Sequence, residues 1–232
     1  MPRRLRYFLS GIPQHVLQCG NNGQPAFFSE ADYRFYLACL KDAAITHACD
    51  VHAYALLSDQ AQLLLTPRAP GGISRLMQSL GSSYGQYFNT VHHRHGTLWE
   101  NRYRASLVDP TNYVLCCYVY TELRPVCAGL VCRPQEYPWS SCRGHVGIAL
   151  DRLIIDHPCF RSLGNTETSR RTAYLKMLAH GLDAGLAERI ARAMSCCRVL
   201  GEARFEEEIE RLLARRIRPG RRGRPRKEIA AD

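Results

Sequence analysis

Segments with a strand-like pattern of apolar residues and segments with a helix-like pattern follow one another along this chain in an order that few folds share. Residues that alternate in character predict strands, and apolar residues three or four positions apart predict amphipathic helices. The turn Gly20–Gly23 ends the first alternating segment, and Ser29 can cap the helix that follows, with Asp32 in its first turn. The expected elements are a strand at 14–19, a helix at 29–47, a hairpin of strands at 51–57 and 61–67, a helix at 73–90, a strand at 98–108 and a helix at 111–123.

This order, β-α-β-β-α-β and then a further helix, is that of a ferredoxin-like split βαβ sandwich in the α+β class. Residues 145–165 read as irregular. A helical C-terminal extension follows from about 168 to 217, with two or three helices divided around Gly181, Gly185 and Gly201. The last segment is too rich in Pro, Gly and Arg to pack, so we expect a disordered basic tail. We therefore divide the chain into residues 1–145, 146–217 and 218–232.

The charge of the chain indicates a polyanionic partner. Lys and Arg number 31 against 21 Asp and Glu, which gives a net charge of +10. The segment from Arg215 to Lys227 contains eight basic residues and no acidic one. This concentration favours nucleic acid as the partner. The alternative is an oligomeric interaction protein whose basicity is incidental.

The cysteines follow neither a disulfide framework nor a zinc site. There are eleven, an odd number, and no two of them are spaced as CxxC. Free thiols in a reducing cytoplasm are the simplest account. No apolar run approaches the ~20 residues that span a membrane. We therefore expect a cytoplasmic protein with no membrane partner.

Tyr120 is the candidate catalytic residue, at the start of the segment YTELRPVCAGLV. A tyrosine hydroxyl can act as a covalent nucleophile when a base or a metal lowers its pKa, or when a cation receives the charge on a phosphate. The alternative, which composition alone favours, is that Tyr120 simply packs beside its neighbours Tyr113 and Tyr118.

Five segments, in order, resemble sequence blocks of the REP-associated tyrosine transposases, a group within the single-tyrosine HUH transposases. They are GIPQHVLQCGNNGQPAFF, ISRLMQSL, GTLWENRYR, YTELRPVCAGLV and YPWSS, and the resemblance covers about Gly11 to Arg143. The later segment RVLGEARFEEEI also resembles the tail region of that family. The resemblance implies a ferredoxin-like fold, binding to imperfect hairpins of palindromic repeat DNA, and cleavage through a 5′-phosphotyrosine with one divalent metal. The family's nucleophile falls on Tyr120.

The chain departs from the family at the positions of the implied metal site. The family's two histidines on the second hairpin strand fall on Gln60 and Gln62, and its polar ligand four residues after the tyrosine falls on Arg124. Glutamine is a neutral, weak oxygen ligand, and arginine stays protonated and cannot bind a metal. Two arginines of the family are replaced by Cys19 and Cys127. We therefore expect a DNA-binding protein without metal-dependent cleavage and without a cofactor.

In the alternative, the protein remains an active transposase that nicks DNA and transfers strands. Arg124 would supply the positive charge, and Tyr120 would still form the 5′-phosphotyrosine. Mg²⁺ or Mn²⁺ would then be the cofactor. The run His92–His95 is better explained as a polar turn than as a substitute metal site.

Polar and basic residues in three places are expected to contact single-stranded or hairpin DNA. Strand alternation along WENRYR would separate Trp99, Asn101 and Tyr103 from Glu100, Arg102 and Arg104. The tail motif RRGRPRK resembles an AT-hook core, although a non-specific phosphate-binding tail is the favoured interpretation. A homodimer and a nucleoid-associated location are also expected. The predicted DNA-binding residues are Asn21, Asn22, Arg102, Arg104, Arg221, Arg222, Arg224, Arg226 and Lys227.

Overall fold

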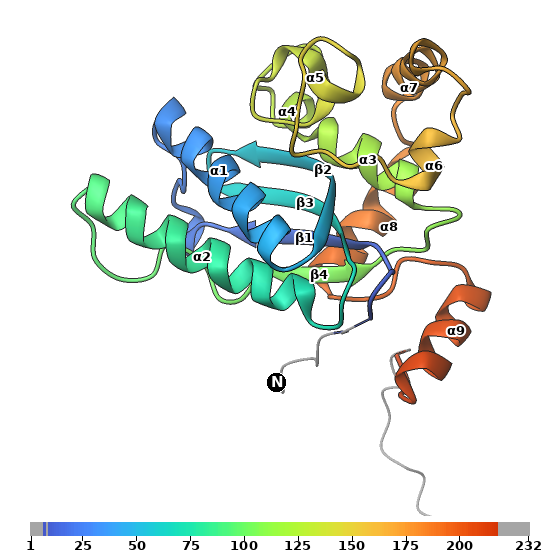
Figure 1. Ribbon diagram of the computed structural model, residues 1–232, viewed down its shortest axis with the longest axis horizontal. Coiled ribbons are helices and arrows are strands. Elements are labelled where there is room, and N and C mark those ends of the chain that lie inside the picture. Colours follow the sequence, from blue (N-terminus) through green and yellow to red (C-terminus); the bar gives the residue numbers. More distant parts are fainter. Residues whose placement is uncertain (1–6, 8, 218–232) are drawn as a thin grey trace, which may run out of the picture.

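A computed structural model describes residue 7 and residues 9–217 of the chain (Figure 1). Its centre is an antiparallel sheet of four strands in the order β2-β3-β1-β4. Because β3 lies between β1 and β2, the topology is the split βαβ that the sequence predicts. The strands are β1 (Gln14–Cys19), β2 (Cys49–Leu57), β3 (Gln60–Pro67) and β4 (Arg104–Leu107).

Helices α1 (Glu30–Thr46) and α2 (Gly72–Val91) cover one face of the sheet (Figure 1). The start of α1 is fixed by Asp32, whose carboxylate accepts hydrogen bonds of 2.8 Å from the backbone N–H groups of Phe28 and Ser29. One side of α2 is apolar and packs into the core, with Tyr87 half-buried at the border of that side. Its buried side chains are Ile73, Leu76, Met77, Leu80, Tyr84 and Phe88.

Helices α3 (Val114–Glu122) and α8 (Ala184–Ser195) lie on the opposite face of the sheet (Figure 1). A second core forms there, and it joins Leu64 of β3 and Tyr118 of α3 to Tyr174 of α7 (Glu167–His180). The predicted helical C-terminal extension is thus confirmed, and it shares this core with α3.

Two of the three glycines expected to divide the C-terminal helices do so. Gly181 ends α7 with a φ of 71°, and Gly201 precedes α9 (Ala203–Leu213). Gly185, however, lies within the first turn of α8, so the break expected there is wrong. The start of α8 is set instead by Asp183, whose side chain accepts a 2.9 Å hydrogen bond from the backbone N–H of Leu186.

The strand predicted at 98–108 is wrong over its first half. Trp99 makes only an isolated bridge to Gly20, and Asn101 has a φ of 54°, which no strand residue adopts. Trp99 packs instead against Phe27 and Tyr84 in the core under α1 and α2, and the chain turns to reach it. The two-faced alternation expected for Trp99, Glu100, Asn101, Arg102 and Tyr103 therefore does not exist.

The helix predicted at 111–123 begins only at Val114 and is followed by one more turn, α4 (Arg124–Cys127). Pro125 does not stop the chain from turning, because it lies in the first turn of α4, where its missing N–H needs no partner. The region expected to be irregular at 145–165 includes α6 (Pro158–Arg161). The remaining short elements are α5 (Cys142–His145) and the 3₁₀ turns η1 (Asn21–Gly23) and η2 (Pro134–Glu136).

The eleven cysteines all lie in the described part of the chain, and each is a free thiol, as the sequence predicts. Within residues 7 and 9–217, no helix combines the length and the apolar character that crossing a bilayer requires.

Candidate active site and nucleic-acid interface

The candidate site lies between the sheet and α3. Alternate residues of β1 and β3 pack into the core under α1 and α2, so the residues between them face α3. In β1 these are His15, Leu17 and Cys19. In the antiparallel register, Gln62 of β3 lies opposite Leu17, and Gln60 lies opposite Cys19. The two glutamines are therefore neighbours on the face of the sheet that α3 covers.

Tyr120 reaches the same face from α3 and is half-buried. Its ring meets the His15 ring edge-on, with 5.7 Å between the ring centroids. The guanidinium carbon of Arg124, one helical turn further on, lies 5.6 Å from the centroid of the Tyr120 ring. Burial raises the pKa of Tyr120, and the positive charge of Arg124 opposes that rise. The phenol is therefore held in its neutral form at neutral pH.

His15 was not found from the sequence, although it contacts Tyr120. Its side chain is fully buried, and its Nε2 lies 3.1 Å from Oγ1 of Thr121 on α3. Burial, with a further contribution from Arg124, lowers the pKa of His15 to about 4. The imidazole is thus neutral and weakly basic. The only sequence signal was its place in an alternating strand, which gives its face but not its partner.

The residues at the implied metal positions do not fit a divalent cation. Gln62 is almost fully buried, and its Nε2 makes a long hydrogen bond of 3.5 Å to Oε1 of Gln60. Neither amide carries the negative charge or the imidazole nitrogen that holds such a cation. Arg124 brings a permanent positive charge that acts on both His15 and Tyr120. Among the described residues, no group of three His, Cys, Asp or Glu side chains is placed to hold a metal.

Several buried polar atoms around this site have no hydrogen-bond partner among the described residues. They are Nδ1 of His15, Oε1 of Gln62, Nε of Arg124 and Oγ of Ser106, which lies opposite His15 on β4. Each such atom costs about 1–3 kcal/mol when it is left unpaired in a protein interior. A polar ligand bound beside Tyr120 would supply partners for such atoms.

Arg104 of β4 lies next to the candidate site. Arg104 pairs with Leu17 of β1, and β4 and β3 lie on opposite sides of β1, so Arg104 and Gln62 flank Leu17 from either side. The Arg104 side chain is exposed. Its charge acts on Cys19: burial raises the pKa of that thiol, and Arg104 opposes the rise. Glu100 lies 3.8 Å from Arg104 at the surface, a distance that adds little stability. Arg104 is therefore available to a phosphate at the edge of the site.

The other predicted DNA-binding residues lie elsewhere. Arg102 is exposed and lines a cavity on the α2 side of the sheet. Asn21 and Asn22 form the turn η1 after β1, where the Asn21 N–H binds the carbonyl of Leu98 at 2.8 Å and Asn22 has a φ of 54°. The tail predictions lie outside the described residues: Arg221, Arg222, Arg224, Arg226 and Lys227.

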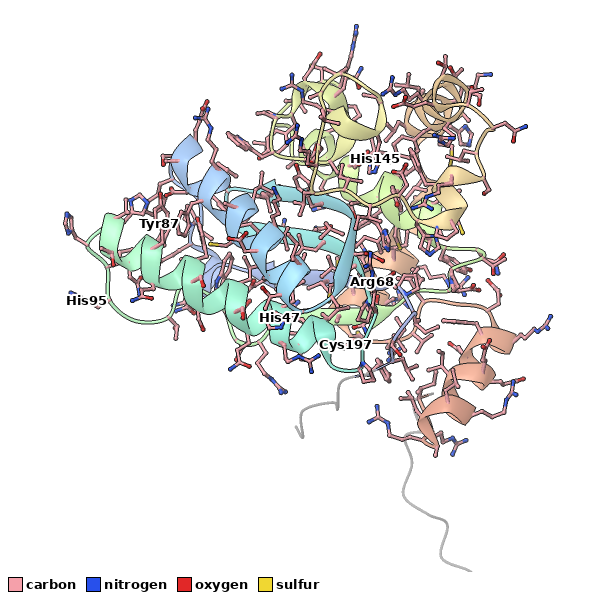
Figure 2. The ribbon with its side chains drawn as sticks, in the orientation of Figure 1. His47, Arg68, Tyr87, His95, His145 and Cys197 are labelled. Carbon is pink, nitrogen blue, oxygen red and sulfur yellow. The ribbon has the colours of Figure 1, made fainter. Side chains whose placement is uncertain are left out.

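The histidine run after α2 is also remote from Tyr120. Nε2 of His92 lies 2.9 Å from Oδ1 of the buried Asp32, which ties the end of α2 to the start of α1. His95 lies beyond the end of α2, at the left end of the molecule as drawn and well away from His145, which lies beside α3 (Figure 2). The run therefore contributes a structural contact at His92.

Glu122, two residues after Tyr120, is fully buried and fixes the orientation of α3. Its Oε1 accepts hydrogen bonds from Oγ of Ser141 at 2.5 Å and from Nδ1 of His145 at 2.6 Å. Its Oε2 accepts a 2.7 Å hydrogen bond from the hydroxyl of Tyr174 on α7. Three segments far apart in the sequence thus meet at one carboxylate, and the sequence gave no sign of this.

No protein-family model matches the sequence, and no curated protein matches it significantly. The fold is similar to a solved structure described as a REP-associated tyrosine transposase bound to a REP hairpin: the TM-score is 0.52 and the identity 13%, over 68% of this chain and 92% of the other. A candidate transposase from Deinococcus radiodurans is 17% identical, with a TM-score of 0.36, over 56% of this chain and 96% of that one. The first of these similarities establishes the architecture: this chain has the fold of a REP-associated tyrosine transposase.

Proposed function

We propose that this protein binds single-stranded or hairpin DNA of palindromic repeats and does not cut it by a metal-dependent reaction. The observation that carries the proposal is that Tyr120 lies on a transposase-like scaffold, with Gln60, Gln62 and Arg124 at the positions where the sequence resemblance implies metal ligands. We further propose that the protein acts in the cytoplasm, associated with the nucleoid. The net charge of +10 supports a nucleic acid as the ligand.

The chemistry around α3 suits a DNA phosphate. Ser106 and Arg124 each have a buried donor atom that is unpartnered within the described part of the chain. Arg104 adds an exposed guanidinium at the edge of the same face. Phosphate oxygens accept hydrogen bonds from hydroxyl and guanidinium groups, and such contacts position a strand without reading its sequence. The solved neighbour is described as bound to a REP hairpin, which supports the choice of ligand.

The same surroundings make cleavage unfavourable. In the attack, a bond forms between the Tyr120 oxygen and phosphorus, the bond from phosphorus to the 3′-oxygen breaks, and the phenol proton must pass to a base. Burial raises the pKa of Tyr120, so the phenol holds its proton more tightly than usual. His15 is beside it, but a base with a pKa of about 4 is a poor acceptor for that proton.

The test uses hairpins taken from the DNA that flanks the gene, with unstructured strands of the same length as controls. Binding is measured by fluorescence anisotropy, and nicking by denaturing gels, with and without Mg²⁺ or Mn²⁺. We expect salt-dependent binding and no nicked product. Robust nicking with a covalent adduct on Tyr120 would contradict the proposal. Self-association without affinity for any strand would favour the oligomeric interaction protein instead.

Restoration of the metal positions gives a second test. The triple variant Gln60→His, Gln62→His and Arg124→Asn returns the side chains that the resemblance implies. If it gains metal-dependent nicking that the parent lacks, then loss of the metal ligands explains the inactivity. The same triple variant carrying Tyr120→Phe is the matched control and must remain inactive.

An active strand transferase is the second candidate, and one observation favours it. The Arg124 guanidinium lies over the Tyr120 ring, where it opposes the rise in the phenol pKa and could receive phosphate charge. This candidate predicts nicking by the parent protein, assayed with and without Mg²⁺ or Mn²⁺, that Tyr120→Phe abolishes. Equal nicking by the parent and by Tyr120→Phe would eliminate it.

A further inference from the structure

A cavity of about 560 Å³ lies on the other side of the sheet, between α2 and the segment 96–103. Its walls are largely apolar and aromatic, from Met77, Leu98, Trp99 and Tyr103, and polar side chains such as Asn101 surround them. Its size is in the range of small-ligand pockets, which lie between ~300 and 1,000 Å³. None of the chemistry assigned to the α3 face uses this cavity.

Small residues on α2 leave the cavity open. Gly81, Ser82 and Gly85 lie on the side of the helix that lines it. A Cβ atom added at Gly85 would meet no atom within 4 Å, so empty space begins directly at the backbone. A glycine in mid-helix destabilises it by ~1 kcal/mol relative to alanine. This position therefore gives up helix stability and leaves room for a ligand.

Two buried polar groups in the cavity wall lack a partner among residues 7 and 9–217. One is the amide oxygen of Gln18, whose residue is only 6% exposed, and the other is the indole Nε1 of Trp99. An acceptor and a donor without partners in one apolar cavity call for a ligand that supplies the complementary donor and acceptor. A flat aromatic ring with polar edges meets that requirement and also suits the aromatic walls.

Resting on the proposed function, we propose that this cavity holds one base of single-stranded DNA, unstacked from its neighbours. A nucleobase is a planar heteroaromatic ring with donors and acceptors on its edge, and aromatic side chains bind such rings by stacking. Gln18 and Trp99 then read the base edge, and the exposed Arg102 at the cavity border contacts the adjoining phosphate.

The position of the cavity connects it to the α3 face. Gln18 faces α2, whereas its neighbours Leu17 and Cys19 face α3. Arg102 lies at the cavity, and Arg104, two residues later, lies on the α3 side of β4, the edge strand of the sheet. A strand whose base enters the cavity can therefore pass over this edge toward Tyr120. The cavity consequently selects a base at a fixed distance from the nucleotide beside Tyr120.

The experiment combines a cavity-filling variant with a scan of the DNA. Gly85→Leu places a side chain in the empty space, and Ser83→Leu adds the same side chain at an exposed position of α2 outside the cavity. Hairpin strands with an abasic site at each position in turn are titrated against the parent and both variants. For the parent and Ser83→Leu, we expect one abasic position to weaken binding by about fivefold or more. For Gly85→Leu, we expect all positions to bind alike, with its salt-dependent affinity otherwise kept.

A second variant and a tryptophan fluorescence measurement distinguish loss of base binding from misfolding of Gly85→Leu. Gln18→Met removes the amide at nearly constant size and should change the preference among the four bases at the sensitive position. The chain has two tryptophans, so Trp139→Phe leaves Trp99 as the sole tryptophan fluorophore. Its emission should respond to intact strands and not to the strand that is abasic at that position. Two results would overturn the base-binding proposal. In the first, the parent binds every abasic strand with the same affinity; in the second, Gly85→Leu keeps the same sensitive position as the parent.

Failure of the proposed function gives a different result. If the parent binds no strand at all, DNA binding is wrong, and the Trp139→Phe protein is titrated with nucleoside monophosphates alone. A saturable Trp99 signal that Gly85→Leu abolishes would then retain the cavity as a base site. The absence of that signal would eliminate it.

Discussion

His15 shows how a single buried side chain shapes the chemistry around Tyr120. The imidazole is enclosed between β1 and α3, with Oγ1 of Thr121 at 3.1 Å from its Nε2 and no partner for Nδ1 among the described residues. Burial disfavours the protonated form and lowers the pKa of His15, and the positive charge of the nearby Arg124 lowers it further. Protonation of His15 therefore lowers the stability of the folded protein.

The first prediction concerns acid stability. The folded-state pKa of His15 is about 4, below the ordinary value of 6.5, so the unfolded chain binds the proton first as pH falls. The contribution of His15 is fully present above pH 6.5 and is lost as pH falls toward 4, by up to about 3 kcal/mol. In urea unfolding series, His15→Gln should lose less stability across that window than the parent.

His95→Gln is the matched control for this prediction, since His95 is exposed. It should follow the parent at every pH. Parallel curves for the parent and for His15→Gln would show that His15 takes up its proton as readily in the folded protein as in the unfolded chain.

Sequence reasoning identified candidate residues of the site but not their contacts. Gln60, Gln62 and Tyr120 could be found because a resemblance gave their positions. His15 and Glu122 could not, because their partners come from other elements: Thr121 for His15, and Ser141 for Glu122. Periodicity predicts the face on which a residue lies, whereas a buried partner depends on how elements pack.

Among the elements, the turn η1 at the end of β1 is held by contacts to two other segments. The Gly20 N–H donates a 2.7 Å hydrogen bond to the carbonyl of Asp59, and the Asn21 N–H donates to Leu98. A Cβ atom at Gly20 would lie 2.0 Å from the carbonyl oxygen of Gln24, so only glycine fits there. This turn holds together the end of β1, the hairpin of β2 and β3, and the segment before β4.

The second prediction is that Gly20→Ala lowers the free energy of unfolding by about 2–3 kcal/mol, because the backbone of η1 must move away. Gly85→Ala is the matched control. Its Cβ meets open space within a helix, so it should raise stability by ~0.5–1 kcal/mol. Urea unfolding measures both. Equal stability of Gly20→Ala and the parent would mean that η1 is not held in this geometry.

The elements with regular periodicity were predictable, and those that depend on distant packing were not. β1, β2, β3, α1 and α2 follow clear alternating or helical patterns. The segment before β4 looks like a strand, but the large Trp99 side chain is half-buried and packs against Phe27, Tyr36 and Tyr84, and the chain bends to place it there. Burial of an aromatic ring outweighed local propensity at this point.

For the molecule as a whole, the last described residues lie beside β4, an edge strand of the sheet. Ile217 packs with Leu107 of β4 and with Phe205 and Ile209 of α9. Arg104 begins the same strand. The six basic residues from Arg218 to Lys227 therefore follow directly after a segment anchored beside β4.

The third prediction concerns salt. Replacing the six basic residues of the tail with glutamine should lower the slope of log affinity against log salt for single strands by up to about 4, since each neutralised phosphate contributes ~0.7. Fluorescence anisotropy over a KCl series measures the slope. Pro225→Ala keeps every charge and should leave the slope unchanged. An unaltered slope after the six replacements would exclude the tail from phosphate contact.

The hydrogen bonds that meet at Glu122 also bear on how a gene of this kind can shorten over time. A premature stop after α3 would delete Ser141, His145 and Tyr174 together, and with them three hydrogen-bond donors to the Glu122 carboxylate. Loss of these three contacts should destabilise the native packing of α3. Substitutions elsewhere that keep the chain at full length leave the contacts at Glu122 intact.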